Sequence, residues 1–409
     1  MRSTRHVLHV PHVRHVLVFV ATCATAACTS LLGSYDVGGD QQQGGPDGSG
    51  PTSEGGQTTE AGAGDTSVPT DAPSDSAPTC AAPKTVCGTS CVNLTFDADN
   101  CGACGHGCLG GFCSARSCQP ALAYPRTDVV AKTLVATDTD LFFDTTSHQV
   151  FQQPVAAGGA AIKLATATGG VFDIAVVAPR VYFTALNSDG LTWDVWLASI
   201  GMAASGVAGG GMYGGTPVGL VVAGGNVHTA NTLSGGPATF RITSCSLTAG
   251  SGCVANFTGP GVPGSRMAAG AGSIFWTDQA SGAVYAMPDA IGLRTTIGGT
   301  EGTATAASWD GASLFWVQNN TGKLRRSPYP SPAPADVRDL TSSADDLVVD
   351  GTNVYYAQYD GMTEQIYALA KGGASAPVKI ASGRASRLAQ TPTGIYWAEA
   401  DGIHVIRKP

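Results

Sequence analysis

Short triplets of apolar and aromatic residues recur along the chain from residue 121 onward. Their middle residues are separated by 40, 46, 47, 40, 40 and 41 residues. A period near 40 residues is typical of the blades of a β-propeller. The triplets therefore predict seven repeated units. Six of them read LFF (141–143), VYF (181–183), IFW (274–276), LFW (314–316), VYY (354–356) and IYW (395–397), and a weaker copy, VHT (227–229), lies between the second and third of these.

The units also keep an internal order of short apolar segments, four in the clearest of them. In residues 346–381 these segments are LVVD, VYYAQ, QIYALA and PVKIA, and turn-forming residues such as Asp-Gly-Thr-Asn separate them. Strands that are short and apolar on both faces fit blades packed face to face. We therefore expect an all-β chain in which residues 120–409 form a seven-bladed propeller.

The last unit, residues 384–409, contains only three strand-like segments. A strand-like sequence, TDVVA (127–131), precedes the first unit. If this segment were the fourth strand of the last blade, the ring would close and both open sheet edges would disappear. We predict this closure.

The N-terminus predicts export. Residues 1–27 carry arginines followed by an apolar run at 16–27, which is too short to span a bilayer and typical of a signal peptide. Small residues then precede Cys28, as in a bacterial lipobox, so Cys28 is expected to become a lipidated first residue; ordinary cleavage at the same place is the alternative. We expect an exported lipoprotein of the outer membrane or cell surface, which contacts the membrane only through its lipid.

Residues 28–79 are expected to be a disordered linker. The stretch 36–79 contains no Lys or Arg and almost no residue that could enter a core. Such a composition cannot offset the entropy lost on ordering. The linker would act as a spacer.

A cysteine-rich segment occupies residues 80–119. Eight of the twelve cysteines of the chain lie there, a density typical of small disulfide-stapled modules in an oxidising compartment. Eight cysteines allow 105 pairings, and the sequence does not choose among them. The weaker alternatives are a redox pair in Cys101-Gly-Ala-Cys104 and a zinc site with His106. The cysteines are Cys80, Cys87, Cys91, Cys101, Cys104, Cys108, Cys113 and Cys118.

The stretch CVNLTFDADNCGACGHGC from Cys91, with two further cysteines, resembles the stigma-specific cysteine-rich family. The resemblance implies an extracellular disulfide knot and no activity. The FWTD at 275–278 resembles YWTD-like and NHL-like propellers, but the other repeats lack the Asp, so no receptor function is implied. The whole layout resembles uncharacterised surface lipoproteins of bacteria.

Two further cysteines, Cys245 and Cys253, flank LTAGSG in the third unit. We expect a disulfide between them, across the hairpin that joins the third and fourth strands of that blade. It would stabilise the fold by about 2–3 kcal/mol.

Charge and motifs exclude several classes of function. The formal net charge is −8, and there is no basic stripe, so nucleic-acid binding is not expected. The histidines share no metal-ligand spacing, and no nucleophile elbow or phosphate loop is present. We therefore predict no cofactor, no metal and no catalytic residue, although a propeller enzyme can gather its site from several blades.

Three acidic residues that follow second strands are the possible ligand-facing positions, on the loop surface of the ring: Asp278, Glu399 and Asp401. The aromatic residues of the triplets are expected in the core between blades. The favoured function is a surface-displayed binding or interaction module, monomeric, whose partner is an envelope polymer or protein. The alternative is a secreted propeller hydrolase or lyase that acts on a polysaccharide or other polymer.

Overall fold

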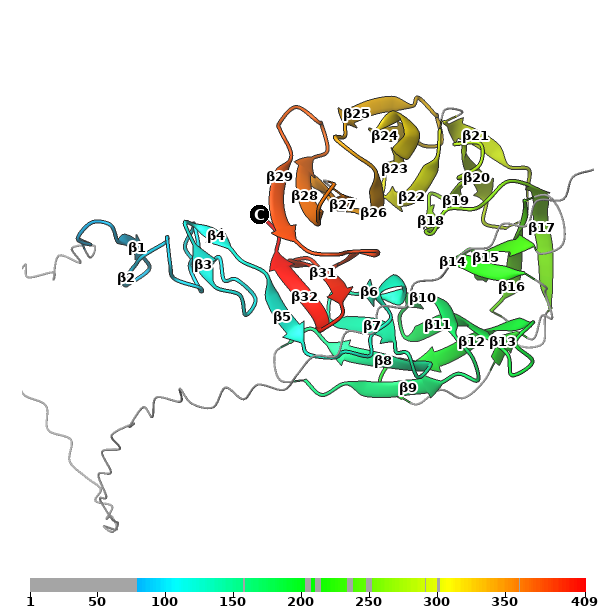
Figure 1. The fold of residues 1–409 in the computed structure, drawn as a ribbon, viewed down its shortest axis with the longest axis horizontal. Coiled ribbons are helices and arrows are strands. Elements are labelled where there is room, and N and C mark those ends of the chain that lie inside the picture. Colours follow the sequence, from blue (N-terminus) through cyan, green and yellow to red (C-terminus); the bar gives the residue numbers. More distant parts are fainter. Residues whose placement is uncertain are drawn as a thin grey trace, which may run out of the picture. The chain divides into compact units, whose positions relative to one another are not determined.

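The computed structural model describes residues 79–409, apart from 157–158, 203–206, 210–214, 234–237, 248–251, 291, 300–301 and 360. The predicted signal peptide, Cys28 and nearly all of the linker lie outside the described residues. Within this part, seven four-stranded sheets stand around one central axis, as Figure 1 shows. The prediction of an all-β, seven-bladed propeller is confirmed. No helix of the described part is long and apolar enough to cross a bilayer.

Every blade is an antiparallel sheet, and in six of the seven blades the four strands follow one another in sequence. The first four blades are β6–β9 (Val135–Ala136, Asp140–Asp144, Gln149–Pro154, Ile162–Thr166), β10–β13 (Val171–Val177, Arg180–Leu186, Trp193–Ser199, Val207–Gly209), β14–β17 (Thr216–Ala223, Asn226–Leu233, Thr239–Ser246, Cys253–Pro260) and β18–β21 (Ala268–Gly270, Ser273–Thr277, Val284–Pro288, Thr295–Gly298). The other three are β22–β25 (Ala304–Trp309, Ser313–Gln318, Lys323–Pro328, Ala335–Asp339), β26–β29 (Ala344–Val349, Asn353–Tyr359, Glu364–Ala370, Val378–Ser382) and β30–β32 with β5 (Ala389–Gln390, Gly394–Glu399, Gly402–Arg407, Ala121–Tyr124).

The triplets form the second strands and supply the core between blades. Five hydrophobic clusters pair the middle aromatic residue of one triplet with the third residue of the next blade's triplet. Because neighbouring side chains of a strand point to opposite faces, each second strand serves both flanking interfaces. The expected inter-blade core is confirmed by the pairs Phe142/Phe183, Phe275/Trp316, Phe315/Tyr356, Tyr355/Trp397 and Tyr396/Phe143.

A segment that precedes the first blade completes the last blade, as predicted, but the predicted segment is wrong. The fourth strand of the last blade is β5 (Ala121–Tyr124), which pairs with β32. The expected segment, 127–131, instead contributes only a bridge from Val129 to Thr145 and the start of a 3-10 turn. The physical reason is distance: a fourth strand lies at the outer rim and β6 at the axis, so the residues just before β6 must cross from rim to axis.

The cysteine-rich segment is stapled by four disulfides. Its strands are only two or three residues long: β1 (Thr85–Cys87), β2 (Ser90–Val92), β3 (Cys113–Ser114) and β4 (Ser117–Cys118). Cys101 and Cys104 belong to different bridges, so they form no redox pair, and no thiolate remains free for zinc among these eight. The prediction of a disulfide-rich region is confirmed. The bridges are Cys80–Cys91, Cys87–Cys104, Cys101–Cys113 and Cys108–Cys118.

The propeller carries a disulfide in its third blade. Cys245 of β16 and Cys253 of β17 stand directly opposite each other in the register of the two strands. The bridge therefore spans the hairpin between the third and fourth strands of that blade, where the sequence predicts it.

Candidate functional site

One position in each blade lies at the start of its inner strand, ten residues before the third residue of the triplet. Since all inner strands run in the same direction around the axis, these positions meet at one end of the central channel, which we call the channel mouth. The inner strands β10, β14, β18, β22 and β26 surround this axis in Figure 1. The seven ring positions are Thr133, Asp173, Gly219, Arg266, Ala306, Asp346 and Arg387.

Local backbone irregularities accompany the ring. The pairing of the inner and second strands shifts between Val171 and Asp173 in β10, and between Ala344 and Asp346 in β26. Such bulges re-aim the side chain that follows them. Each bulge thus immediately precedes a ring aspartate.

One ion pair crosses the channel from the seventh blade to the second. Arg387 Nη1 lies 2.8 Å from Asp173 Oδ1, and the same nitrogen donates to the carbonyl of Lys132 in the first blade at 3.1 Å. The second oxygen of Asp173 accepts the backbone N–H of Leu220 in the third blade at 2.8 Å. This brace therefore links four blades.

A second ion pair joins the fourth blade to the sixth. Arg266 Nη1 lies 3.2 Å from Asp346 Oδ2 and donates to the carbonyl of Leu347 at 2.9 Å. Its other terminal nitrogen donates to the carbonyl of Leu388 at 2.7 Å, while the N–H of Leu388 donates to Asp346 at 2.8 Å. Each ring aspartate thus caps the inner strand of the next blade.

Burial makes both braces sensitive to loss of a partner. Asp173 and Asp346 are 0% and 2% exposed. Burial raises the pKa of Asp173, and the charge of Arg387 opposes that rise. Burial lowers the pKa of Arg266, which Asp346 counteracts, and an arginine stays charged in a protein. Removing one partner would leave a buried charge uncompensated.

A cavity of about 390 Å³ opens at the channel mouth. Its lining includes Lys132, Phe172, Ser265, Arg266, Asp346 and Arg387. Lys132 is exposed, its ammonium lies 5.6 Å from the ring centre of Phe172, and it forms no ion pair with any described residue. Nε of Arg387 and Oδ1 of Asp346 also have no hydrogen-bond partner in the described part. The lining of this cavity therefore contains a cation without an ion pair and two polar atoms without a hydrogen bond, counted among the described residues.

The other end of the channel has a different character. A cavity of about 370 Å³ there is lined mainly by valine and alanine, together with Trp309 and Arg266. Trp309 stacks on Phe275 with ring centres 5.2 Å apart. Most of the charged side chains that line the two cavities therefore lie at the mouth.

Asp278 requires a correction, because it does not face solvent. Its side chain is 2% exposed. The carboxylate accepts the N–H groups of Val262 and Ala280 at 2.9 and 3.0 Å and the hydroxyl of Ser281 at 2.6 Å. It fastens the turn after β19 to the preceding segment, and only its neighbour Gln279 reaches the cavity lining.

Glu399 and Asp401 lie at the turn between β31 and β32. Glu399 accepts the indole N–H of Trp397 at 2.6 Å, whereas Asp401 is 61% exposed and lies 2.7 Å from His404 Nε2. Ligand atoms of Glu399, Asp401 and His404 all fall within 4.8 Å of one another. The sequence did not associate His404 with them, and none of the three lines the mouth cavity.

The four charged ring residues were missed from the sequence because each is a single charge in a different repeat. A signal does exist. Aligning the seven repeats on their triplets brings Asp173, Arg266, Asp346 and Arg387 to one position, ten residues before the third triplet residue. Charges at an inner-strand position of a propeller point to the channel.

Comparison with known proteins supports the fold. Solved structures similar to this chain include a streptogramin B lyase (TM-score 0.56, 10% identity, covering 70% of this chain and 97% of that one) and virginiamycin B lyase from Staphylococcus aureus (0.55, 10%, 71% and 99%). The WD40 β-propeller domain of Doa1 is also similar (0.52, 10%, 71% and 97%). At these identities the likeness shows the propeller fold alone.

No protein-family model matches the chain, and no curated protein matches it. The resemblance of the cysteine-rich segment to the stigma-specific family therefore stays a sequence-based prediction.

Proposed function

We propose that this chain is an exported, surface-displayed binding protein whose ligand occupies the channel mouth of the propeller. The observation that carries the proposal is the cavity of about 390 Å³ whose lining includes the exposed Lys132 together with Asp346 and Arg387, which each have one polar atom without a hydrogen-bond partner in the described part. Small-molecule sites combine a concave surface with a few placed polar groups in this way.

The state of the two carboxylates favours binding over polymer hydrolysis. Asp173 and Asp346 each hold an arginine and a backbone N–H. A general acid or base must exchange a proton with its substrate, whereas both carboxylates serve as the counter-charges of arginines. The propeller hydrolase or lyase is therefore the second candidate, which the experiment below also tests.

The contacts of the cysteine-rich segment support display of the mouth. His106 Nε2 lies 3.3 Å from the carbonyl oxygen of Lys408, and Leu109 approaches Gly394. Both propeller residues belong to the ends of strands opposite the mouth: Gly394 ends the turn after the inner strand, and Lys408 follows the third strand. The cysteine-rich segment therefore meets the propeller on the side opposite the mouth, and none of its residues lines the mouth cavity.

Retention on envelope fractions tests the proposal. The full chain is applied to peptidoglycan, surface polysaccharide and outer-membrane vesicles of the producing cell, beside the variant Ser265→Trp, which fills the cavity from an exposed lining position. Ser375→Trp, an exposed change far along the chain and outside the cavity lining, is the matched control.

Saturable retention of the wild type and of Ser375→Trp, with loss in Ser265→Trp, is the expected result. Equal retention of all three proteins would remove the channel mouth as the site. Release of soluble fragments from a fraction would show turnover and favour the lyase or hydrolase.

A further inference from the structure

We infer that the ligand of the channel mouth carries an anionic group, a carboxylate or a phosphate, which is bound by Lys132 with Arg387 and Arg266 behind it. This inference rests on the proposed function of the mouth and adds the chemical class of its ligand.

The charges at the mouth do not balance. Three cationic side chains, Lys132, Arg266 and Arg387, line the cavity, whereas only Asp346 among its lining residues is acidic. Asp173 pairs with Arg387 below. Two acids against three cations leave one positive charge, in a chain whose formal net charge is −8. A positive cavity in an acidic protein attracts anions to this place.

Lys132 is the cation that remains available. Both arginines form ion pairs with aspartates, which partly neutralise their charges. The ammonium of Lys132 lies 5.6 Å from the ring centre of Phe172 and forms no ion pair with a described residue. Such a cation–π contact orients an ammonium group without neutralising it.

The backbone of Lys132 is fixed in advance. The residue lies in the 3-10 turn Ala131–Thr133, and its carbonyl oxygen accepts a hydrogen bond from Arg387 Nη1 at 3.1 Å. The hydroxyl of Thr133 bonds the carbonyl of Val130 at 3.0 Å and the carboxyl group of Asp144. A site whose residues are already placed loses less entropy when its ligand arrives.

Asp144 is a further acid whose charge interacts with Lys132, and it does not supply a strong counter-charge. It is 1% exposed and bonded to Thr133. Burial raises the pKa of Asp144 to about 7, against the lowering effects of the Thr133 hydroxyl and of Lys132. Near neutral pH its carboxyl group is therefore only partly ionised.

A second observation that supports an anionic ligand is a hydrogen-bond donor of Arg387 without an acceptor. Its side chain is 10% exposed and lines the cavity, and its Nε has no hydrogen-bond partner among the described residues. An N–H donor of a buried guanidinium without an acceptor is costly. An oxygen of a carboxylate or phosphate is the acceptor that guanidinium groups bind best.

Two small anions serve as probes of the full chain. Glucuronate is followed by saturation-transfer difference NMR, and inorganic phosphate by its ³¹P line width, at constant ionic strength in sodium chloride. We expect at least one of them to bind saturably. Lys132→Gln should weaken that binding about tenfold or more, since a charged hydrogen bond is lost, and Lys132→Arg should retain it. Lys163→Gln, on the outer strand β9 of the same blade, removes an equal charge and should have no effect.

Binding of phosphate alone would identify a phosphate-bearing ligand, and binding of glucuronate alone an acidic saccharide. Saturable binding of neither probe, or equal binding by Lys132→Gln and wild type, would overturn the inference. The proposed function fails separately: if Ser265→Trp abolishes retention on an envelope fraction while Lys132→Gln leaves it unchanged, the mouth binds a ligand that is not anionic.

Discussion

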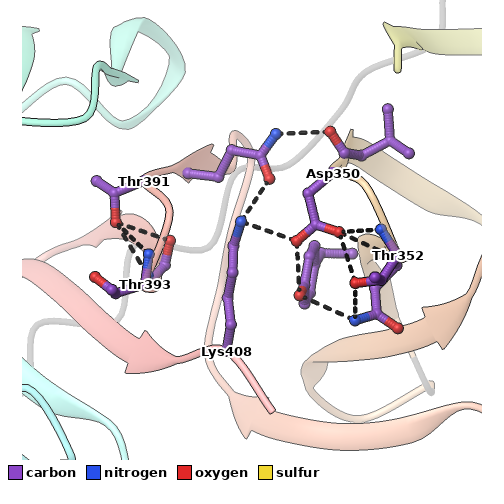
Figure 2. Close-up of polar contacts among 10 residues, drawn as sticks. Asp350, Thr352, Thr391, Thr393 and Lys408 are labelled. Carbon is purple, nitrogen blue, oxygen red and sulfur yellow. Dashed lines mark hydrogen bonds and ion pairs between the residues drawn. The ribbon is translucent and has the colours of Figure 1, made fainter. Parts of the chain in front are cut away.

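Lys408 Nζ lies 3.0 Å from Oδ2 of Asp350, so the residue that follows β32 fastens the seventh blade to the sixth (Figure 2). The same ammonium donates to Gln390 Oε1 at 3.0 Å. An equivalent pair, Lys371 and Asp310, joins the sixth blade to the fifth. In both pairs the lysine follows a third strand and the aspartate follows the inner strand of the preceding blade. The same lock therefore joins blades at two successive interfaces.

The first prediction concerns the pH dependence of this lock. Burial alone would raise the pKa of Asp350, but the N–H groups of Asn353 and Thr352 and the ammonium of Lys408 outweigh it and lower the pKa to about 2. Because this lies below the ordinary value of 3.8, the stabilisation is complete above about pH 4 and is lost as the pH falls toward 2. Asp350→Asn should lower the free energy of unfolding by about 1–2 kcal/mol at pH 7, allowing for solvent screening, and by much less at pH 2.

Urea unfolding at both pH values measures this difference. Asp138→Asn is the control, because Asp138 is exposed in the turn before β7. A loss in Asp350→Asn that is the same at pH 2 and pH 7 would contradict the role of the charge.

The second prediction concerns the brace between Asp173 and Arg387. Arg387→Met alone should destabilise the propeller by about 3–5 kcal/mol, because it leaves the carboxylate of Asp173 buried without its counter-charge. Asp173→Leu combined with Arg387→Met should recover most of that loss, since no buried charge then remains. Chemical denaturation of the two single variants and the double variant gives the coupling energy. Additive losses would mean that the ion pair contributes nothing.

The third prediction concerns ring closure. A chain that begins at residue 125 keeps the segment 127–131 but lacks β5, so the outer edge of β32 is left open. We expect it to unfold at lower temperature and to aggregate, because an unpaired edge recruits other strands. A chain that begins at residue 120 keeps β5 and is the control for loss of the cysteine-rich segment. Equal melting temperatures of the two chains would show that β5 does not close the ring.

The fourth prediction concerns the anchor. Cys28→Ser should shift the exported protein from the detergent phase to the aqueous phase in Triton X-114 partitioning, because acyl chains attached at Cys28 supply the membrane affinity. Cys23→Ser should leave the partition unchanged. A wild-type protein found in the aqueous phase would mean that ordinary cleavage, and not lipidation, occurs before Cys28.

The sequence by itself determined the number of blades, the four-strand order and the residues of the inter-blade core. These features are local: the triplet spacing and the alternation within each triplet, such as Tyr355 and Tyr356, can be read within one repeat. It also located the cysteine-rich segment by composition alone.

Only the tertiary structure decided the disulfide partners, the strand that closes the ring and the charges that meet at the channel mouth. Asp278 illustrates the limit, since its position after a second strand was visible but the three donors that bury it were not. The physical reason is that closure of the ring sets distances between residues far apart in the chain. Arg387 and Lys132 are 255 residues apart, and they touch only because the seventh blade lies beside the first.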